Sequence, residues 1–175
     1  MIPKSDPGNS RFVVWMAVAL IVVVADQVTK RAIIEFIELY GRVPLNSVVN
    51  LTHQRNTGAA FSFLADAGGW QRWFFVALAS LVSVVIGIWV WRIRYQGPAI
   101  LAAGLALVLG GAVGNLIDRI LHGYVTDFIQ VWFGDWAFPS FNVADAAITV
   151  GAALLIIESL FLSGRDAAKS SDREV

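Results

Sequence analysis

Four apolar stretches, each as long or nearly as long as a membrane-spanning segment, dominate this sequence. A spanning α-helix needs about 20 mainly apolar residues. The chain of 175 residues is also 57% hydrophobic and only 15% charged, which is more apolar than a soluble domain of this size requires. We therefore predict an all-α integral membrane protein with four transmembrane helices, formed as a single polytopic domain over residues 1–175. The predicted helices lie at about residues 12–36, 71–93, 98–120 and 141–162.

The first stretch has some features of a cleavable export signal, because Lys4 and Arg11 precede an apolar run that ends at Ala25. The amphipathic pattern continues past Ala25 instead of breaking, which favours an uncleaved helix. The short turn WRIRYQGP, residues 91–98, is basic, as cytoplasmic turns between membrane helices usually are. This turn predicts that both termini are cytoplasmic, although Lys and Arg are almost as frequent on the opposite side of the membrane.

The composition argues against several classes of function. The formal net charge is zero, so no basic surface indicates a nucleic-acid partner. The chain has no cysteine, which excludes disulfides, thiol nucleophiles and thiolate metal sites. His53 and His122 are far apart in the sequence and form no HExxH-type pair, so we expect no histidine metal centre.

Two polar segments separate the predicted helices on one side of the membrane, and that side is where a functional site would be built. Residues 40–68 contain a Val-Val-Asn-Leu-Thr run with flanking turn residues, which indicates short strands. Residues 121–140 are expected to form two short strands about a Gly-Asp turn. Aromatic residues crowd this second segment, and they favour the membrane surface. Residues 1–10 and 163–175 are polar and are expected to be disordered cytoplasmic tails.

Charged and amide side chains occur near the outward ends of the apolar stretches. An ionisable group at the bilayer centre costs roughly 2.5–3.5 kcal/mol on insertion scales, so such residues should face protein or water. Asp26 and Lys30 are four residues apart and can pair on one helix face, where the pair can simply neutralise itself. Gly110 and Gly114 have the same spacing, which lets helices pack closely or leaves room for the backbone of a substrate.

Two further pairs, Asn115 with Asp118 and Asn142 with Asp145, are three residues apart on their helices. Asn142 and Asp145 stand at the start of the fourth helix, where they can cap it. Together with Asp127, these residues supply at least two carboxylates that converge from separate elements. Two close carboxylates do not both ionise easily, so one holds a proton near neutral pH. Such a pair suits peptide hydrolysis, but a proton relay in a transporter would use the same residues.

Five motifs occur in order along nearly the whole chain. They are DQVTK at 26–30, NTGAAFS at 56–62, GGAVGNLIDR at 110–119, VTDF at 125–128 and FNVAD at 141–145. In these motifs the sequence resembles the bacterial lipoprotein signal peptidases (type II signal peptidases), and no motif position departs from the family pattern. The resemblance implies a four-helix peptidase of the bacterial inner membrane with its active site at the periplasmic face. It also implies that the first outward segment is a small β-cradle and the second a mobile flap.

The resemblance further implies the substrate and the roles of individual residues. The substrates would be prolipoproteins that carry diacylglycerol on the lipobox cysteine, and cleavage just before that cysteine would need no metal or cofactor. Apart from the resemblance, we expect a monomer in contact with membrane lipids and no nucleic-acid partner. The catalytic pair would be Asp127 and Asp145, and the choice of Asp127 over Asp118 comes from the resemblance alone. The residues that would bind the substrate backbone or order the site are Asn56, Asn115, Arg119 and Asn142. The residues that would support the site are Asp26, Lys30, Asp118, Gly110 and Gly114.

Two other functions remain open at this level. A small proton-coupled carrier would need polar residues through the depth of the bilayer, whereas here they cluster at one end, apart from Glu158. A non-catalytic membrane scaffold would use the aspartates only for packing, so replacing them with asparagine would be harmless.

Overall fold

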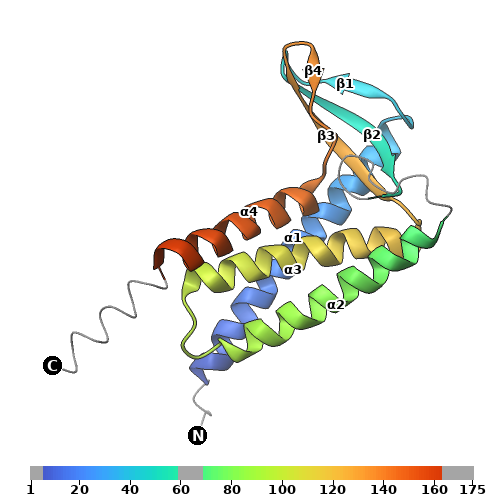
Figure 1. Ribbon diagram of the computed structural model, residues 1–175. Helices are drawn as coiled ribbons and strands as arrows, with labels where there is room; N and C mark the ends of the chain where they lie inside the picture. The colour runs from blue at the N-terminus through green and yellow to red at the C-terminus, as the bar shows by residue number, and fades with distance from the viewer. Residues whose placement is uncertain (1–5, 59–68, 163–175) are drawn as a thin grey trace, which may run out of the picture.

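The computed structural model of the protein describes residues 6–58 and 69–162, and Figure 1 shows a bundle of helices with a small sheet at one end. In chain order the elements are α1 (Pro7–Phe36), β1 (Arg42–Pro44), β2 (Val49–Asn56), α2 (Trp70–Arg92), α3 (Ala99–Leu121), β3 (Val125–Phe133), β4 (Trp136–Ala137), α4 (Val143–Ile157) and the π-helical turn η2 (Glu158–Leu162). Within the described residues, four helices are long and apolar enough to cross a membrane, and they confirm the four predicted spans. The predicted strands are also present, in a single four-stranded sheet.

Helix α3 is the centre of the bundle, because α1, α2 and α4 all pack against it while they expose most of their own apolar surface. Its buried positions are dominated by Ala, Gly and Leu, which allow close packing on several sides. One core cluster joins Leu105 and Leu109 of α3 to Ala19 of α1 and to Ile86 and Val90 of α2.

Two glycines of α3 show why small residues are needed in this bundle. A Cβ atom added to Gly110 would lie 2.7 Å from the carbonyl oxygen of Ala19 in α1. A Cβ atom added to Gly114 would lie 2.7 Å from Oδ2 of Asp26 and 3.4 Å from Cβ of Ala144 in α4. Both distances to oxygen are shorter than real Cβ contacts, so the glycines let the helices approach closely. This supports the packing interpretation of the GGAVG stretch.

The helix ends differ from the predicted ones in ways that local interactions explain. Helix α1 begins at Pro7, so part of the predicted 1–10 tail is helical. Asp6 caps this helix by accepting a hydrogen bond from the Gly8 N–H at 3.0 Å, and the Tyr95 hydroxyl donates to its other oxygen at 2.7 Å. Helix α4 begins at Val143 rather than at residue 141, because Asn142 is its N-cap. The predicted 163–175 tail lies outside the described residues.

The sheet has the order β1-β2-β3-β4 with antiparallel neighbours, and it joins the two predicted outward segments. Residues 125–133, predicted as part of a separate flap, pair with β2 as the central strand β3, so this stretch and the cradle form one structure. The pairing of β2 with β3 shifts between Leu51 and Gln54. The sheet is fixed to the bundle by a cluster of Ile33, Ile37 and Phe128 at the end of α1.

Candidate functional site

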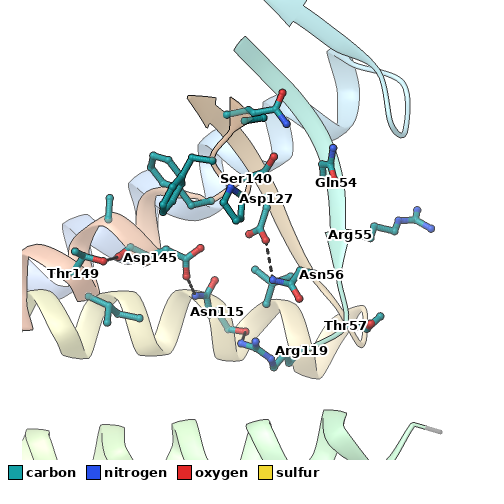
Figure 2. Close-up of a pocket in the computed structure, with 18 of the residues that line it drawn as sticks. Gln54, Arg55, Asn56, Thr57, Asn115, Arg119, Asp127, Ser140, Asp145 and Thr149 are labelled. Carbon is teal, nitrogen blue, oxygen red and sulfur yellow. Dashed lines mark hydrogen bonds between the residues drawn. The ribbon is translucent and has the colours of Figure 1, made fainter. Parts of the chain in front are cut away.

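A cleft of about 1020 Å³ lies where the sheet meets the ends of α3 and α4. Strands β2 and β3, helices α3 and α4, and the segment that leads from β4 into α4 all contribute to its walls. Figure 2 shows Asp127 from the sheet and Asp145 from α4 on neighbouring walls of this cleft, with Asn56, Asn115 and Arg119 close by. The cleft therefore brings together residues that are far apart in the sequence, such as Asn56 and Asp145, which are 89 positions apart.

Asp127 is buried near the start of β3, where two amide groups hold its carboxyl group. The Asn56 side chain donates to Oδ2 at 3.0 Å, and the Asn142 side chain donates to Oδ1 at 2.7 Å. Burial raises the pKa of Asp127 to about 7, and the negative charge of nearby Asp145 adds to this rise. The two amide hydrogen bonds act in the opposite direction but do not cancel it. This carboxyl group can therefore hold a proton at neutral pH.

Asp145 lies in the first turn of α4 and belongs to a capping box. Its backbone N–H donates to Oδ1 of Asn142 at 2.9 Å, and its own Oδ2 accepts from the Asn142 backbone N–H at 3.3 Å. Its other oxygen, Oδ1, accepts from the Asn115 side chain at 2.8 Å. The predicted capping role of Asn142 and Asp145 is confirmed, and both side chains also take part in the network at the cleft.

Asn142 links the two carboxyl groups, because its side chain donates to that of Asp127 and its backbone N–H donates to that of Asp145. Its Nδ2 donates to Asp127 while its Oδ1 accepts from the backbone of Asp145, so the amide can have only one orientation. Asn142 is completely buried. It therefore fixes the start of α4 relative to strand β3.

Behind the cleft, Lys30 lies at the centre of a second buried group of carboxylates. Its ammonium group is 2.8 Å from Oδ2 of Asp26 and 3.0 Å from Oδ2 of Asp118, and it donates to Oδ1 of Asn115 at 2.9 Å. The predicted pair of Asp26 with Lys30 is confirmed, but it is completed by Asp118 from α3. We call Asp26, Lys30 and Asp118 the lysine triad.

The lysine triad also holds the two elements that carry Asp127 and Asp145. Asp26 accepts a hydrogen bond from the backbone N–H of Ala144 at 2.9 Å, which fixes the first turn of α4 to α1. Asp118 accepts from the backbone N–H of Thr126 at 3.1 Å, which fixes β3 to α3. The triad therefore positions the backbone one residue before Asp145 and one residue before Asp127.

Arg119 lies on the wall of the cleft beside Asn115. Its guanidinium group donates to the carbonyl oxygen of Gly58 at 3.0 Å and stacks over the Phe75 ring at 5.0 Å. Asn56 is held in turn, because its Oδ1 accepts from the Gly58 N–H at 3.0 Å. Thus Arg119 and Asn56 both tie the end of β2 to the cleft.

The sequence-predicted residues fall into three places. Asn56, Asn115, Arg119, Asp127 and Asp145 line the cleft, while Asn142 lies buried just behind it. Asp26, Lys30 and Asp118 form the triad, and Gly110 and Gly114 pack α3 against α1 and α4.

Sequence reasoning missed Gln27, although it lies in the DQVTK motif. Its side-chain amide donates to Oδ1 of Asp118 at 2.9 Å, to the Gly114 carbonyl at 3.1 Å and to Asp26 at 3.2 Å. The signal that could have found it is its position next to Asp26 in an otherwise apolar helix. Gln54, Arg55 and Gln130 also line the cleft and were not singled out, since polar residues on a strand carry no signal of their own.

Taken together, four membrane-length helices and a pair of carboxyl groups on an open cleft define a multi-pass membrane protein with a site suited to acid–base chemistry. The family model described as Signal peptidase (SPase) II matches residues 18–161 of the chain. The chain therefore belongs to the signal peptidase II family, which is a family of peptidases.

Individual relatives agree with this assignment. Proteins named lipoprotein signal peptidase are 46% identical in Shewanella piezotolerans, over 90% of this chain and 92% of the relative, and 49% identical in Teredinibacter turnerae, over 90% of this chain and 92% of the relative. A protein of the same name in Ectopseudomonas mendocina is 46% identical over 94% of this chain and 99% of the relative.

Solved structures support the same fold. A bacterial membrane enzyme solved by the in meso method at 2.3 Å resolution is 32% identical and superimposes with a TM-score of 0.75, covering 84% of this chain and 87% of the solved chain. A second such structure, at 1.9 Å resolution, is also 32% identical and gives a TM-score of 0.73, covering 86% and 94% of the two chains.

Proposed function

We propose that the protein is an aspartic endopeptidase that removes signal peptides from prolipoproteins, with Asp127 and Asp145 as its catalytic pair. The observation that carries this proposal is the position of these two carboxyl groups. They come from different elements, lie on one open cleft and are linked through Asn142, and the pKa of Asp127 is raised to about 7. A pair that shares one proton at neutral pH has the protonation state that peptide hydrolysis needs.

In the proposed reaction, the ionised Asp145 removes a proton from a water molecule, and that water attacks the carbonyl carbon of the scissile peptide bond. Asp127, which holds a proton near pH 7, donates it to the carbonyl oxygen. The tetrahedral intermediate then collapses: Asp145 gives its proton to the leaving amide nitrogen while Asp127 recovers its own from the hydroxyl group. The carbon–nitrogen bond breaks, and both carboxyl groups return to their starting states.

The other residues of the cleft would hold the substrate and the pair in place. Asn56 and Asn142 orient the carboxyl group of Asp127, and Asn115 orients that of Asp145. Arg119, on the cleft wall, would order the end of β2 against which an extended substrate backbone can lie. The lysine triad supports these residues from behind.

The substrate we propose is a prolipoprotein whose cysteine already carries diacylglycerol, cleaved just before that cysteine. The same cleft is lined by Ala146, Ile148 and Val150 on the side of α4, so it continues from the carboxyl groups onto a membrane-facing helix. A lipid anchor confines the peptide to the membrane plane and stabilises it there by about 0.8 kcal/mol per buried methylene. It would also place the scissile bond at a fixed depth beside the catalytic pair.

We place this cleft at the periplasmic face of the bacterial inner membrane, with both termini in the cytoplasm. The basic turn between α2 and α3 supports this orientation, since Arg92 and Arg94 lie at the end of the bundle opposite the sheet. A topology reporter fused after Gln96 should remain in the cytoplasm, and export of that reporter would reverse the orientation.

The proposal is tested by incubating the purified protein in nanodiscs with a precursor peptide that carries diacylglycerol on its cysteine. Mass spectrometry should find the new N-terminus at that cysteine. The same peptide without the lipid should be cleaved far more slowly, even at saturating concentration, because it must lose its translational freedom on binding. Cleavage at another bond, or equal rates for the two peptides, would contradict the proposed substrate.

A further inference from the structure

The β3–β4 hairpin carries a row of aromatic rings that the proposed reaction does not use. Phe133 stacks on Trp136 at 5.9 Å between ring centroids, Trp136 meets the edge of Phe138 at 6.0 Å, and Phe138 meets Phe141 at 6.1 Å. We call these four residues the aromatic ladder. It runs from the tip of the hairpin back to the residue that precedes the N-cap of α4.

The ladder is most exposed at the end that is farthest from the cleft. Phe133 is 61% exposed and Trp136 is 56% exposed, and neither lines the cleft. The turn between β1 and β2 lies beside this tip, since the backbone N–H of Trp132 donates to the Val48 carbonyl at 2.7 Å, and it exposes Leu45 and Val48 as well. A small sheet gains no stability from exposing this much apolar surface at one end, so the surface needs a partner.

The direction of the sheet suggests what that partner is. In Figure 1 the long strands β2 and β3 run across the direction of α3 and α4 instead of extending it. Since α3 and α4 cross the membrane, strands that run across them lie along the membrane plane. The hairpin tip is therefore displaced sideways from the bundle, over the lipid that surrounds it.

The ladder is also continuous with the lipid-facing surface of α4. This helix exposes Val150, Ile156 and Ile157 along its length, and the ladder ends just before the helix begins. The tip sequence FGDWAF, residues 133–138, contains one charged residue, Asp135, and Arg42 stacks on the ring of neighbouring Trp132 at 5.4 Å. Aromatic rings with a few flanking charges are the composition that membrane–water interfaces favour.

We propose that the aromatic ladder is an interfacial anchor, in which Phe133 and Trp136 insert between the lipid headgroups of the leaflet beside α4. The anchor fixes the height of strand β3, and hence of Asp127, relative to the membrane surface. This insertion is independent of any peptidase activity, since it concerns the position of the hairpin in a bilayer without substrate.

The experiment uses the absence of cysteine from the sequence. A nitroxide label is attached to Asp135→Cys at the hairpin tip and, as a control, to Glu38→Cys, an exposed polar position between α1 and β1. Both proteins are placed in phospholipid bilayers, and the accessibility of each label to oxygen and to a water-soluble nickel chelate is measured by electron paramagnetic resonance. We expect the tip label to be several-fold less accessible to nickel, relative to oxygen, than the control label. Equal accessibility would overturn the proposal.

The rings themselves are tested in the labelled Asp135→Cys background. The double change Phe133→Ser and Trp136→Ser should make the tip label as accessible to nickel as the control, whereas Trp136→Phe, which keeps a ring, should not. If the double variant keeps the shielding, the ladder is not the anchor. If shielding disappears when the unaltered protein is diluted with lipid, the partner is a second copy of the chain and the proposal is wrong. If the double variant fails to fold, the proposal is still decided by comparing the labels at Asp135→Cys and Glu38→Cys in proteins that keep both rings.

Discussion

Two pairs of aspartates lie next to each other in this protein, and they differ in the groups that lie between their carboxyl groups. Asp26 and Asp118 share the ammonium group of Lys30, at 2.8 and 3.0 Å. Asp127 and Asp145 are joined only through neutral amide groups, and within residues 6–58 and 69–162 no lysine or arginine forms an ion pair with either. The first pair is closed behind helices, whereas the second faces the cleft.

The difference shows how one fold gives the same side chain two uses. A carboxylate beside a buried cation serves as a fixed hydrogen-bond acceptor, which suits it to hold backbone N–H groups. A buried carboxyl group without a cation keeps its proton to a higher pH and can exchange it near neutrality. This contrast supports the proposal that the lysine triad holds the site in place and that the pair at the cleft is catalytic.

The strongest way to break this comparison is to replace the aspartates one at a time with asparagine, which keeps the shape but cannot exchange a proton. Asp127→Asn and Asp145→Asn should each lower the cleavage rate by about 10³-fold or more. Asp118→Asn is the matched control and should mainly lower stability, because it weakens the contacts to Lys30 and Thr126. The measurements are single-turnover cleavage of a lipidated precursor and thermal unfolding of each variant. If Asp118→Asn is folded but inactive while Asp127→Asn remains active, the roles proposed for the two pairs are wrong.

Replacing Lys30 with a neutral residue should destabilise the protein, because the buried pair of Asp26 and Asp118 then lacks its cation. Lys30→Met leaves Asp26 and Asp118 buried without a counter-charge, at an expected cost of about 3–5 kcal/mol in the free energy of unfolding. The triple change D26N, K30M and D118N removes every charge of the triad and should recover part of this loss. Reversible unfolding in detergent or bilayers measures both variants. If Lys30→Met is as stable as the unaltered protein, the triad does not hold the site.

The stability of the protein should depend on pH through Asp127, which distinguishes the pair at the cleft from the pair that shares Lys30. Its pKa is raised from 3.8 to about 7, so between these values the folded state holds a proton that the unfolded state has lost. The contribution of Asp127 to stability is therefore fully present below about pH 4, falls as the pH rises through this window, and levels off above about pH 7. Asp127→Asn should flatten the profile in this window, and an unchanged profile in that variant would place the titration elsewhere. Cleavage should likewise decline above about pH 7, because the donor proton is lost.

The smallest expected effect concerns the packing that holds the triad in place. Gly114→Ala would put a methyl group 2.7 Å from Oδ2 of Asp26, which should destabilise the protein by about 1–3 kcal/mol. Gly87→Ala in α2 is the matched control, since nothing lies within 4 Å of the added atom. It should be neutral or stabilising by up to about 1 kcal/mol, because alanine favours helix more than glycine does. Equal thermal stability of the two variants would mean that the close approach of α1, α3 and α4 is not required.

Much of the architecture was predictable, because the physical signals for it are local. Four apolar stretches of membrane length gave four helices, and alternation with turn residues gave strands between them. The sequence did not show that the predicted cradle and the stretch predicted as a flap would share one sheet. Pairing of β2 with β3 is a contact between segments separated by two membrane helices, and neither strand alone carries a signal for its partner.

The start of α1 shows the same limit at shorter range. A polar, proline-containing segment predicts disorder, and residues 1–10 were predicted as a tail on that basis. Asp6 is nevertheless held by Tyr95, which belongs to the turn after α2. That contact exists only when α1 and α2 pack side by side, so it stabilises a helix start that the local sequence leaves undecided.

Spacing along single helices determined the pairing of Asp26 with Lys30 and the capping of α4 by Asn142 and Asp145, since residues three or four apart share a helix face whatever surrounds them. Only the tertiary structure decided which remaining aspartate joins Lys30 and which faces the cleft. Asp118 and Asp127 are nine residues apart, across the end of α3 and the start of β3. Packing of α3 against α1 turns Asp118 to the cation, while the pairing of β3 with β2 places Asp127 beside Asn56. The chemistry of each carboxyl group follows from that burial, with a cation for one and without a cation for the other.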